Sequence, residues 1–208
     1  MLSSDPLEKL KKGRTAAIEF IPILRNKLAA RDGSVHAGTI LSAAAWLTGT
    51  SLYRSFNFKE ELPPGATIKS NEVNREWESL MYLFEQYNFQ KADIPVGRLM
   101  LAALAAPDSF KPQVEMLHVQ TELQDRYNAV MKKHGFDYLD GARAGIVVCS
   151  MLLQQYNTAG IIDPSVAAGI VAQGIIEGRQ DSTSLPEISE MIGIGCSWHL
   201  VKYGMLKW

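Results

Sequence analysis

Glu115 and His118 are the residues whose types and spacing come closest to a catalytic motif. On a helix, a Glu-x-x-His pair places a carboxylate and an imidazole one turn apart, where both can bind one metal ion, as in di-iron carboxylate bundles. Glu122 follows one turn after His118 on the same side. Such a bundle requires a second Glu-x-x-His motif, however, and the sequence contains none.

The helix that carries this motif is expected over residues 112–134, and its apolar stripe decides which way the motif points. The stripe consists of Met116, Val119, Leu123, Tyr127 and Val130. At about 100° per residue, Glu115, Glu122 and His118 lie roughly 80°, 100° and 140° from the centre of that stripe. Metal ligands of a bundle point inward, so we interpret these three side chains as a solvated face and predict no metal site there.

Cys196 and His199 form a second candidate, as half of a zinc site. No second Cys or His pair at ligand spacing completes it, because Cys149 stands alone. Cys196 also resembles the nucleophile of papain-type proteases, in which Trp directly follows Cys. Here Ser197 intervenes, and no His or Asn follows His199, so the resemblance does not extend to a catalytic set. The phosphate-binding, dinucleotide-binding and nucleophile-elbow motifs are absent.

The remaining histidines, His36 and His134, are far apart in the sequence. His36 lies near an expected helix start, where a partly exposed polar side chain is ordinary. His134 precedes Gly135 at an expected helix end, where an imidazole interacts favourably with the helix dipole. We assign both a structural role, although a site assembled from several histidines by the fold stays open.

Composition excludes several classes of protein. In 208 residues, 47% hydrophobic and 21% charged side chains are typical of a globular chain, and a net charge of -1 argues against a nucleic-acid binder. A basic segment, interpreted as a solvated helix face, contains Lys9, Lys11, Lys12, Arg14, Arg25, Lys27 and Arg31. Two cysteines favour a reduced compartment, and no apolar run reaches the roughly 18 residues of a membrane span. We therefore expect a cytoplasmic protein with no nucleic-acid or membrane partner.

The positions of apolar residues and helix breakers predict an all-α protein. Helices are expected over residues 5–30, 34–56, 71–88, 96–106, 112–134, 139–158, 164–178 and 186–203, with a weak strand candidate at 198–205. Gly13 and Pro22 should kink the first helix or divide it in two. The result is an irregular bundle of about eight helices with small-residue helix contacts. It forms one domain, 1–208, with a possible subdivision near 57–70 or 107–112.

One apolar stripe admits two interpretations. Residues at helical spacing in 71–88 are Val73, Trp77, Leu80, Met81, Phe84 and Tyr87. We interpret them as a core face rather than an aromatic ligand pocket. A small-molecule-binding regulator would instead use a pocket lined by Trp46, Trp77, Tyr82 or Phe84.

The pattern Asp-x-Ser-Val-x-Ala-Gly occurs twice, beginning at Asp32 and at Asp163, with a looser third copy from Asp140. The simplest explanation is recurring helix-cap chemistry, and duplication or an anion site at the helix starts are the alternatives. Glycine inside a helix costs about 1 kcal/mol relative to alanine. We therefore predict that Asp32 and Asp163 start helices and that Gly38 and Gly169 lie at close helix contacts.

Because the catalytic searches fail, we expect no catalytic, cofactor or metal residue. The function expected is that of a non-catalytic interaction or assembly protein that forms homo-oligomers, with another protein as a further possible partner. The alternatives are a metal-dependent enzyme with a site around Glu115 and His118, or a small-molecule-binding regulator with a site between helices.

The chain stays apolar to its last residue, through Trp198, Leu200, Tyr203, Met205, Leu206 and Trp208. Chain ends are usually polar and frayed, and exposing this surface would cost about 25 cal/mol per Å². We predict that truncation after Ser197 lowers the melting temperature or dissociates an oligomer. Calorimetry and light scattering measure both, and an unchanged Tm with an unchanged mass contradicts the prediction.

Overall fold

The computed structural model describes residues 6–56, 75–76, 79–80, 82–84 and 108–178. Its elements are α1 (Pro6–Leu28), α2 (Ala37–Ser55), the short 3-10 helix η1 (Asp108–Phe110), α5 (Met116–Lys133), α6 (Tyr138–Thr158) and α7 (Pro164–Gly178). Every element in these residues is helical, which confirms the all-α prediction. The helices expected over 96–106 and 186–203, and the strand candidate at 198–205, lie outside the described residues, so the expected count is not tested.

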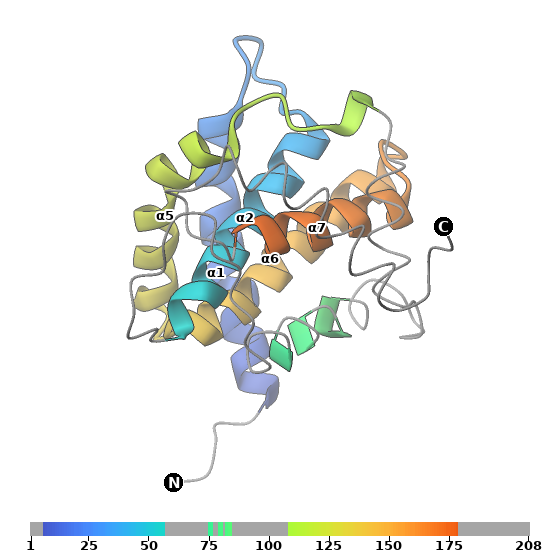
Figure 1. Ribbon diagram of the computed structural model, residues 1–208. Helices are drawn as coiled ribbons and strands as arrows, with labels where there is room; N and C mark the ends of the chain where they lie inside the picture. The colour runs from blue at the N-terminus through green and yellow to red at the C-terminus, as the bar shows by residue number, and fades with distance from the viewer. Residues whose placement is uncertain (1–5, 57–74, 77–78, 81, 85–107, 179–208) are drawn as a thin grey trace, which may run out of the picture.

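The centre of the fold is α2, which the other helices surround (Figure 1). Its residues are buried without interruption from Ala37 to Leu52, so this stretch has no face toward solvent. A helix that is apolar on all sides must be covered on all sides. The cover comes from α1, α5, α6, α7 and η1, with the most extensive packing against α6 and α7. Within the described residues, no helix is long and apolar enough to cross a membrane.

Glycines bring the backbones of α7 and α2 together. A Cβ added at Gly174 would lie 2.6 Å from the Cβ of Ala45, and one added at Gly178 would lie 2.7 Å from the Cα of Trp46 and closer still to its carbonyl. The hydroxyl of Thr50 on α2 donates to the carbonyl of Gly178 at 2.8 Å, beside this contact. No larger side chain fits between the two helices at these positions.

The first copy of the repeated pattern does not start a helix at its aspartate. Asp32 accepts a hydrogen bond from the backbone N–H of Ser34 at 2.9 Å, in a turn where Gly33 has φ 80°. The helix α2 begins later, and its N-cap is His36, whose Nδ1 accepts from the Thr39 N–H at 3.2 Å. The prediction for Asp32 is therefore wrong, because the local turn uses its carboxylate.

The second copy behaves as predicted at its aspartate. Asp163 precedes α7 and accepts from the Val166 N–H at 3.3 Å. Gly38 does lie at a close contact, since an added Cβ would be 2.6 Å from the carbonyl carbon of Phe110 in η1. Gly169 is buried in α7. The aspartates differ in role, so the two copies do not share one capping geometry.

Pro22 does not interrupt α1, which runs as one helix from Pro6 to Leu28. The carbonyl that loses its helical donor at Pro22 belongs to Ile18, four residues earlier. Ile18 and Pro22 are both exposed, so water can satisfy this carbonyl at little cost. The predicted division into two shorter helices is therefore wrong, and the alternative, a kink at Pro22, stays a prediction.

The other predicted boundaries hold closely. The bounds of α7 agree with the prediction, α6 begins one residue earlier, and α5 begins four residues later than expected. Gly135 and Gly160 have positive φ, 78° and 66°, at the ends of α5 and α6. The predicted stripe of α5 is buried at all five positions, from Met116 to Val130. The residues described between 75 and 84 are helical, and Leu80 and Phe84 among them are buried, as predicted for a core face.

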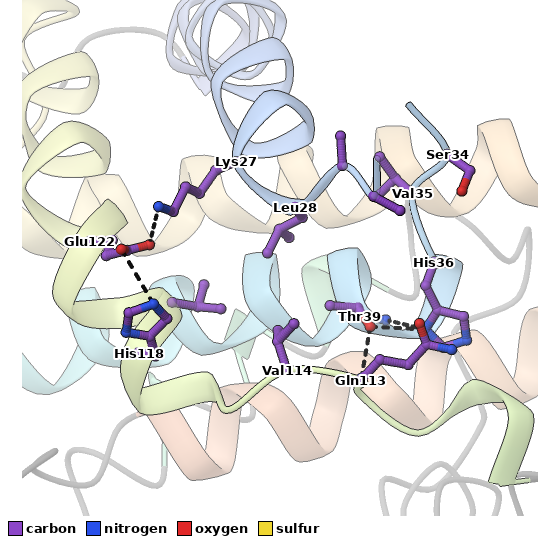
Figure 2. A pocket seen from close by; sticks show the side chains of 13 residues that line it. Lys27, Leu28, Ser34, Val35, His36, Thr39, Gln113, Val114, His118 and Glu122 are labelled. Carbon is purple, nitrogen blue, oxygen red and sulfur yellow. Dashed lines mark hydrogen bonds and ion pairs between the residues drawn. The ribbon is translucent and has the colours of Figure 1, made fainter. Parts of the chain in front are cut away.

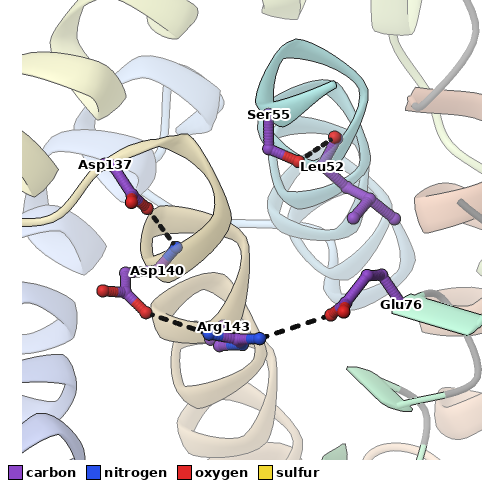
Figure 3. A network of polar contacts seen from close by, with 6 residues as sticks. All are labelled: Leu52, Ser55, Glu76, Asp137, Asp140 and Arg143. Atoms are coloured by element: carbon purple, nitrogen blue, oxygen red, sulfur yellow. Dashed lines mark hydrogen bonds and ion pairs between the residues drawn. The ribbon is translucent and has the colours of Figure 1, made fainter. Parts of the chain in front are cut away.

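Arg143 of α6 connects that helix to Glu76, one of these helical residues (Figure 3). Its guanidinium contacts the carboxylate of Glu76 at 3.3 Å and that of Asp140, on its own helix, at 3.2 Å. The N-terminus of α6 is capped by Asp137, which accepts from the Asp140 N–H at 2.8 Å. Three carboxylates thus gather near the first turns of α6, where the helix dipole favours negative charge.

Two hydroxyls meet in the core beside Gly145. The Tyr127 hydroxyl donates to the carbonyl of Gly141 at 2.8 Å, and its ring contacts Phe20 edge-on with centroids 4.9 Å apart. The Thr48 hydroxyl donates to the carbonyl of Ala44 at 2.8 Å. A Cβ added at Gly145 would lie 2.5 Å from the Tyr127 hydroxyl and closer still to that of Thr48.

We predict that Gly145→Ala destabilises the protein by about 1–3 kcal/mol, because the added methyl group displaces two buried hydroxyls. Gly141→Ala is the control on the same helix, since its Cβ would meet only Met131, at 3.7 Å. This variant should be unchanged or up to about 1 kcal/mol more stable, through helix propensity. Urea denaturation measures both, and equal stabilities for the two variants would contradict the packing argument.

Candidate functional site

A groove with a cavity volume of about 600 Å³ opens where α1 ends and α5 begins (Figure 2). Its wall comes from three parts of the chain: the last turn of α1 with the residues after it, the segment 34–39 that leads into α2, and residues 113–122. Figure 2 shows charged side chains at one end, polar side chains at the other, and Leu28 and Val114 between them.

The charged end is built around the carboxylate of Glu122. Lys27 of α1 forms an ion pair with it, and His118 Nε2 lies 3.3 Å from its other oxygen. The side chains of Lys27, Glu122 and His118 are 41%, 29% and 69% exposed. The hydrogen bond from Lys27 holds the pKa of Glu122 below its usual value, so this carboxylate stays ionised.

The polar end is organised by the N-cap of α2. His36 Nδ1 is 2.9 Å from the Thr39 hydroxyl, and His36 Nε2 is 2.5 Å from the carbonyl of Ser109. The same Thr39 hydroxyl accepts from the backbone N–H of Gln113 at 3.0 Å. These bonds connect residues before α2 to the segment before α5 and fix the shape of this end of the groove.

The predicted metal motif forms no ligand cluster. Glu115 is exposed and is the N-cap of α5 without a side-chain capping bond, while His118 points into solvent, as the helical wheel predicted. Glu122 turns instead toward Lys27 of α1. Among the described residues, no three His, Cys, Asp or Glu side chains lie close enough to hold a metal ion. The absence of a bound metal in the protein stays a prediction.

His134 and Cys149 have structural roles, and Cys196 lies outside the described residues. His134 is the C-cap of α5, and its Nε2 lies 3.0 Å from the carboxylate of Glu19 on α1. Cys149 is fully buried, and burial raises the pKa of its thiol to about 12. Burial likewise raises the pKa of Tyr127 above its ordinary value. Cys196 and His199 lie outside the described residues.

Of the aromatic side chains proposed for a small-molecule pocket, those that the structure describes do not line this groove. Trp46 is buried and donates its indole N–H to Gln120 at 3.0 Å. Phe84 is buried and Tyr82 is exposed, while Trp77 lies outside the described residues. Of the basic segment, Lys11, Lys12 and Arg14 are exposed on α1, as expected for a solvated face.

Sequence reasoning missed the groove because its elements are distant in the chain. Lys27 was grouped with a basic segment and Glu122 with a metal motif, and only the fold pairs them. A local signal existed for His36, which lies three residues before Thr39 in the spacing of an N-cap interaction.

No family, curated protein or solved structure matches this chain.

A second carboxylate also joins α1 to α5 and gives a test of the α1–α5 contact. Glu19 contacts Lys133 Nζ at 2.8 Å and His134 Nε2 at 3.0 Å. The hydrogen bond from Lys133, followed by that from His134, holds the pKa of Glu19 below its usual value of 4.5.

A carboxylate with a lowered pKa stabilises the fold fully above its unfolded-state pKa and loses that contribution as the pH falls through its folded-state pKa. We predict that Glu19→Gln is less stable than the parent at pH 7 and that the difference shrinks below about pH 4.5. Glu115→Gln, at an exposed position, serves as the control. Urea denaturation between neutral and acidic pH decides, and a difference for Glu19→Gln that is constant over this range contradicts the assignment.

Proposed function

We propose that this chain is a non-catalytic helical interaction or assembly protein that forms homo-oligomers, folded as an irregular bundle of about eight helices in one domain, 1–208. The supporting observation is where its perturbed ionisable groups lie. Catalytic groups face a cleft and have pKa values shifted toward the working pH. Tyr127 and Cys149 are instead enclosed in the core, and burial raises their pKa values away from neutral pH. Glu122 lies in the groove, but Lys27 lowers its pKa, so it stays ionised.

The outer face of α1 is the surface that we assign to self-association. Ile18 is 57% exposed there, and the exposed Pro22 lies one turn further along the same face. Exposed Lys11 and Arg14 precede them on the helix and would supply a polar border. An apolar centre with a polar rim is the usual composition of a protein interface. A cytoplasmic location is part of the proposal, supported by the free thiol of buried Cys149.

One observation favours the alternative of a small-molecule-binding regulator. The groove volume of about 600 Å³ falls within the range of roughly 300–1,000 Å³ that is common for ligand sites. Binding in this groove and association through α1 use different surfaces and can be tested separately.

We predict that light scattering of the purified full chain gives a multiple of 23.0 kDa. Ile18→Ser should shift the mass toward that of one chain, because it removes the apolar centre of the contact. Ile161→Ser is the matched control, since Ile161 is 49% exposed after the end of α6. A mass of 23.0 kDa for the parent at every concentration contradicts self-association, and equal effects of both variants contradict the assigned surface.

A further inference from the structure

We propose that the groove between α1 and α5 binds a small zwitterionic molecule with an apolar body, of the class of an apolar amino acid or dipeptide. This inference goes beyond self-association and does not depend on it. It stands on the pairing of opposite charges at one end of the cavity and on the apolar side chains along its middle.

The charged end can bind both charges of such a ligand. A lysine ammonium has three donors and a carboxylate about four acceptor positions. Among the described contacts, Lys27 gives one donor to Glu122, and Glu122 receives one contact from Lys27 and one from His118. Donors on Lys27 thus remain for a ligand carboxylate, and an acceptor position on Glu122 Oε1 remains for a ligand ammonium, while Oε2 is buried beside Lys27.

The balance of charge selects the zwitterion over a simple anion or cation. Lys27 and Glu122 together carry no net charge, and Glu122 stays ionised because Lys27 lowers its pKa. A simple anion near Lys27 would be repelled by Glu122, and a simple cation near Glu122 would be repelled by Lys27. A zwitterionic ligand places its carboxylate near Lys27 and its ammonium near Glu122, so each residue gains an attraction to a group of opposite charge.

The middle of the groove matches the apolar body. Leu28 and Val35 are half-buried, and Val114 is 40% exposed although it is apolar. A ligand side chain placed over them would remove this surface from water at about 25 cal/mol per Å².

Calorimetric titration with three probes tests the assignment directly. Leucyl-leucine carries both charges, N-acetyl-leucyl-leucine lacks the ammonium, and leucyl-leucinamide lacks the carboxylate. We expect saturable binding of leucyl-leucine and at least about tenfold weaker binding of each blocked probe. Absence of saturable binding of leucyl-leucine at millimolar concentration, or equal binding of all three probes, overturns the proposal.

Variants then place the binding in the groove. Lys27→Gln should weaken leucyl-leucine binding at least about tenfold. Lys111→Gln should leave it unchanged, since Lys111 is also paired with a carboxylate, that of Asp108, but lies outside the groove. Circular dichroism and Tm verify that each variant is folded, and the probe comparison on the parent protein needs no variant. Equal affinities of the two folded variants would overturn the groove assignment, whereas the mass measured by light scattering tests self-association separately.

Discussion

The complete burial of α2 is the constraint on which the rest of the described structure depends. From Ala37 to Leu52, each side of this helix must meet another part of the chain, and five of the described elements supply cover. Glycines at Gly38, Gly145, Gly174 and Gly178 then let these elements approach the backbone or short side chains of α2. Thr48 and Thr50 of α2 donate their hydroxyls to backbone carbonyls, so these two buried side chains stay hydrogen-bonded without access to water.

The same constraint creates the groove. Because α2 is central, α1 must end and the chain must turn before α2 begins, and α5 must start beside that turn to cover the other side. Two carboxylates connect α1 to α5: Glu19 of α1 contacts Lys133 and His134 at the end of α5, and Glu122 of α5 contacts Lys27 of α1. The cavity lies beside the ion pair of Lys27 and Glu122. This ion pair therefore both lines the groove and joins α1 to α5. Binding at this place would therefore act on the contact between two helices.

Sequence patterns predicted what depends on neighbours in the chain. The stripe of α5, the helix end at Gly135, the start of α7 at Asp163 and the outward direction of His118 follow from periodicity and capping chemistry. Predictions failed where a local rule competes with the surroundings. Aspartate is a favourable helix cap, but the Asp32 carboxylate accepts a hydrogen bond from Ser34 in a turn before α2. Proline usually breaks a helix, but Pro22 lies on an exposed face, where water can replace the lost backbone hydrogen bond. The groove was not predictable, because it requires Lys27 and Glu122 to meet, and nothing in their local sequence pairs them.

The central position of α2 also has a consequence for biosynthesis. Residues 37–53 carry no charged side chain, and they leave the ribosome long before α6 and α7, which cover them most extensively. Because translation adds about 5–20 residues per second, the nascent chain carries this segment without its final cover for on the order of 10 s. During that interval α1 is the only one of its described helical partners already synthesised, and Arg54 is the first charged side chain after this stretch. The order of the helices along the chain therefore leaves the segment that becomes the centre of the fold without most of its described cover until α6 and α7 are made.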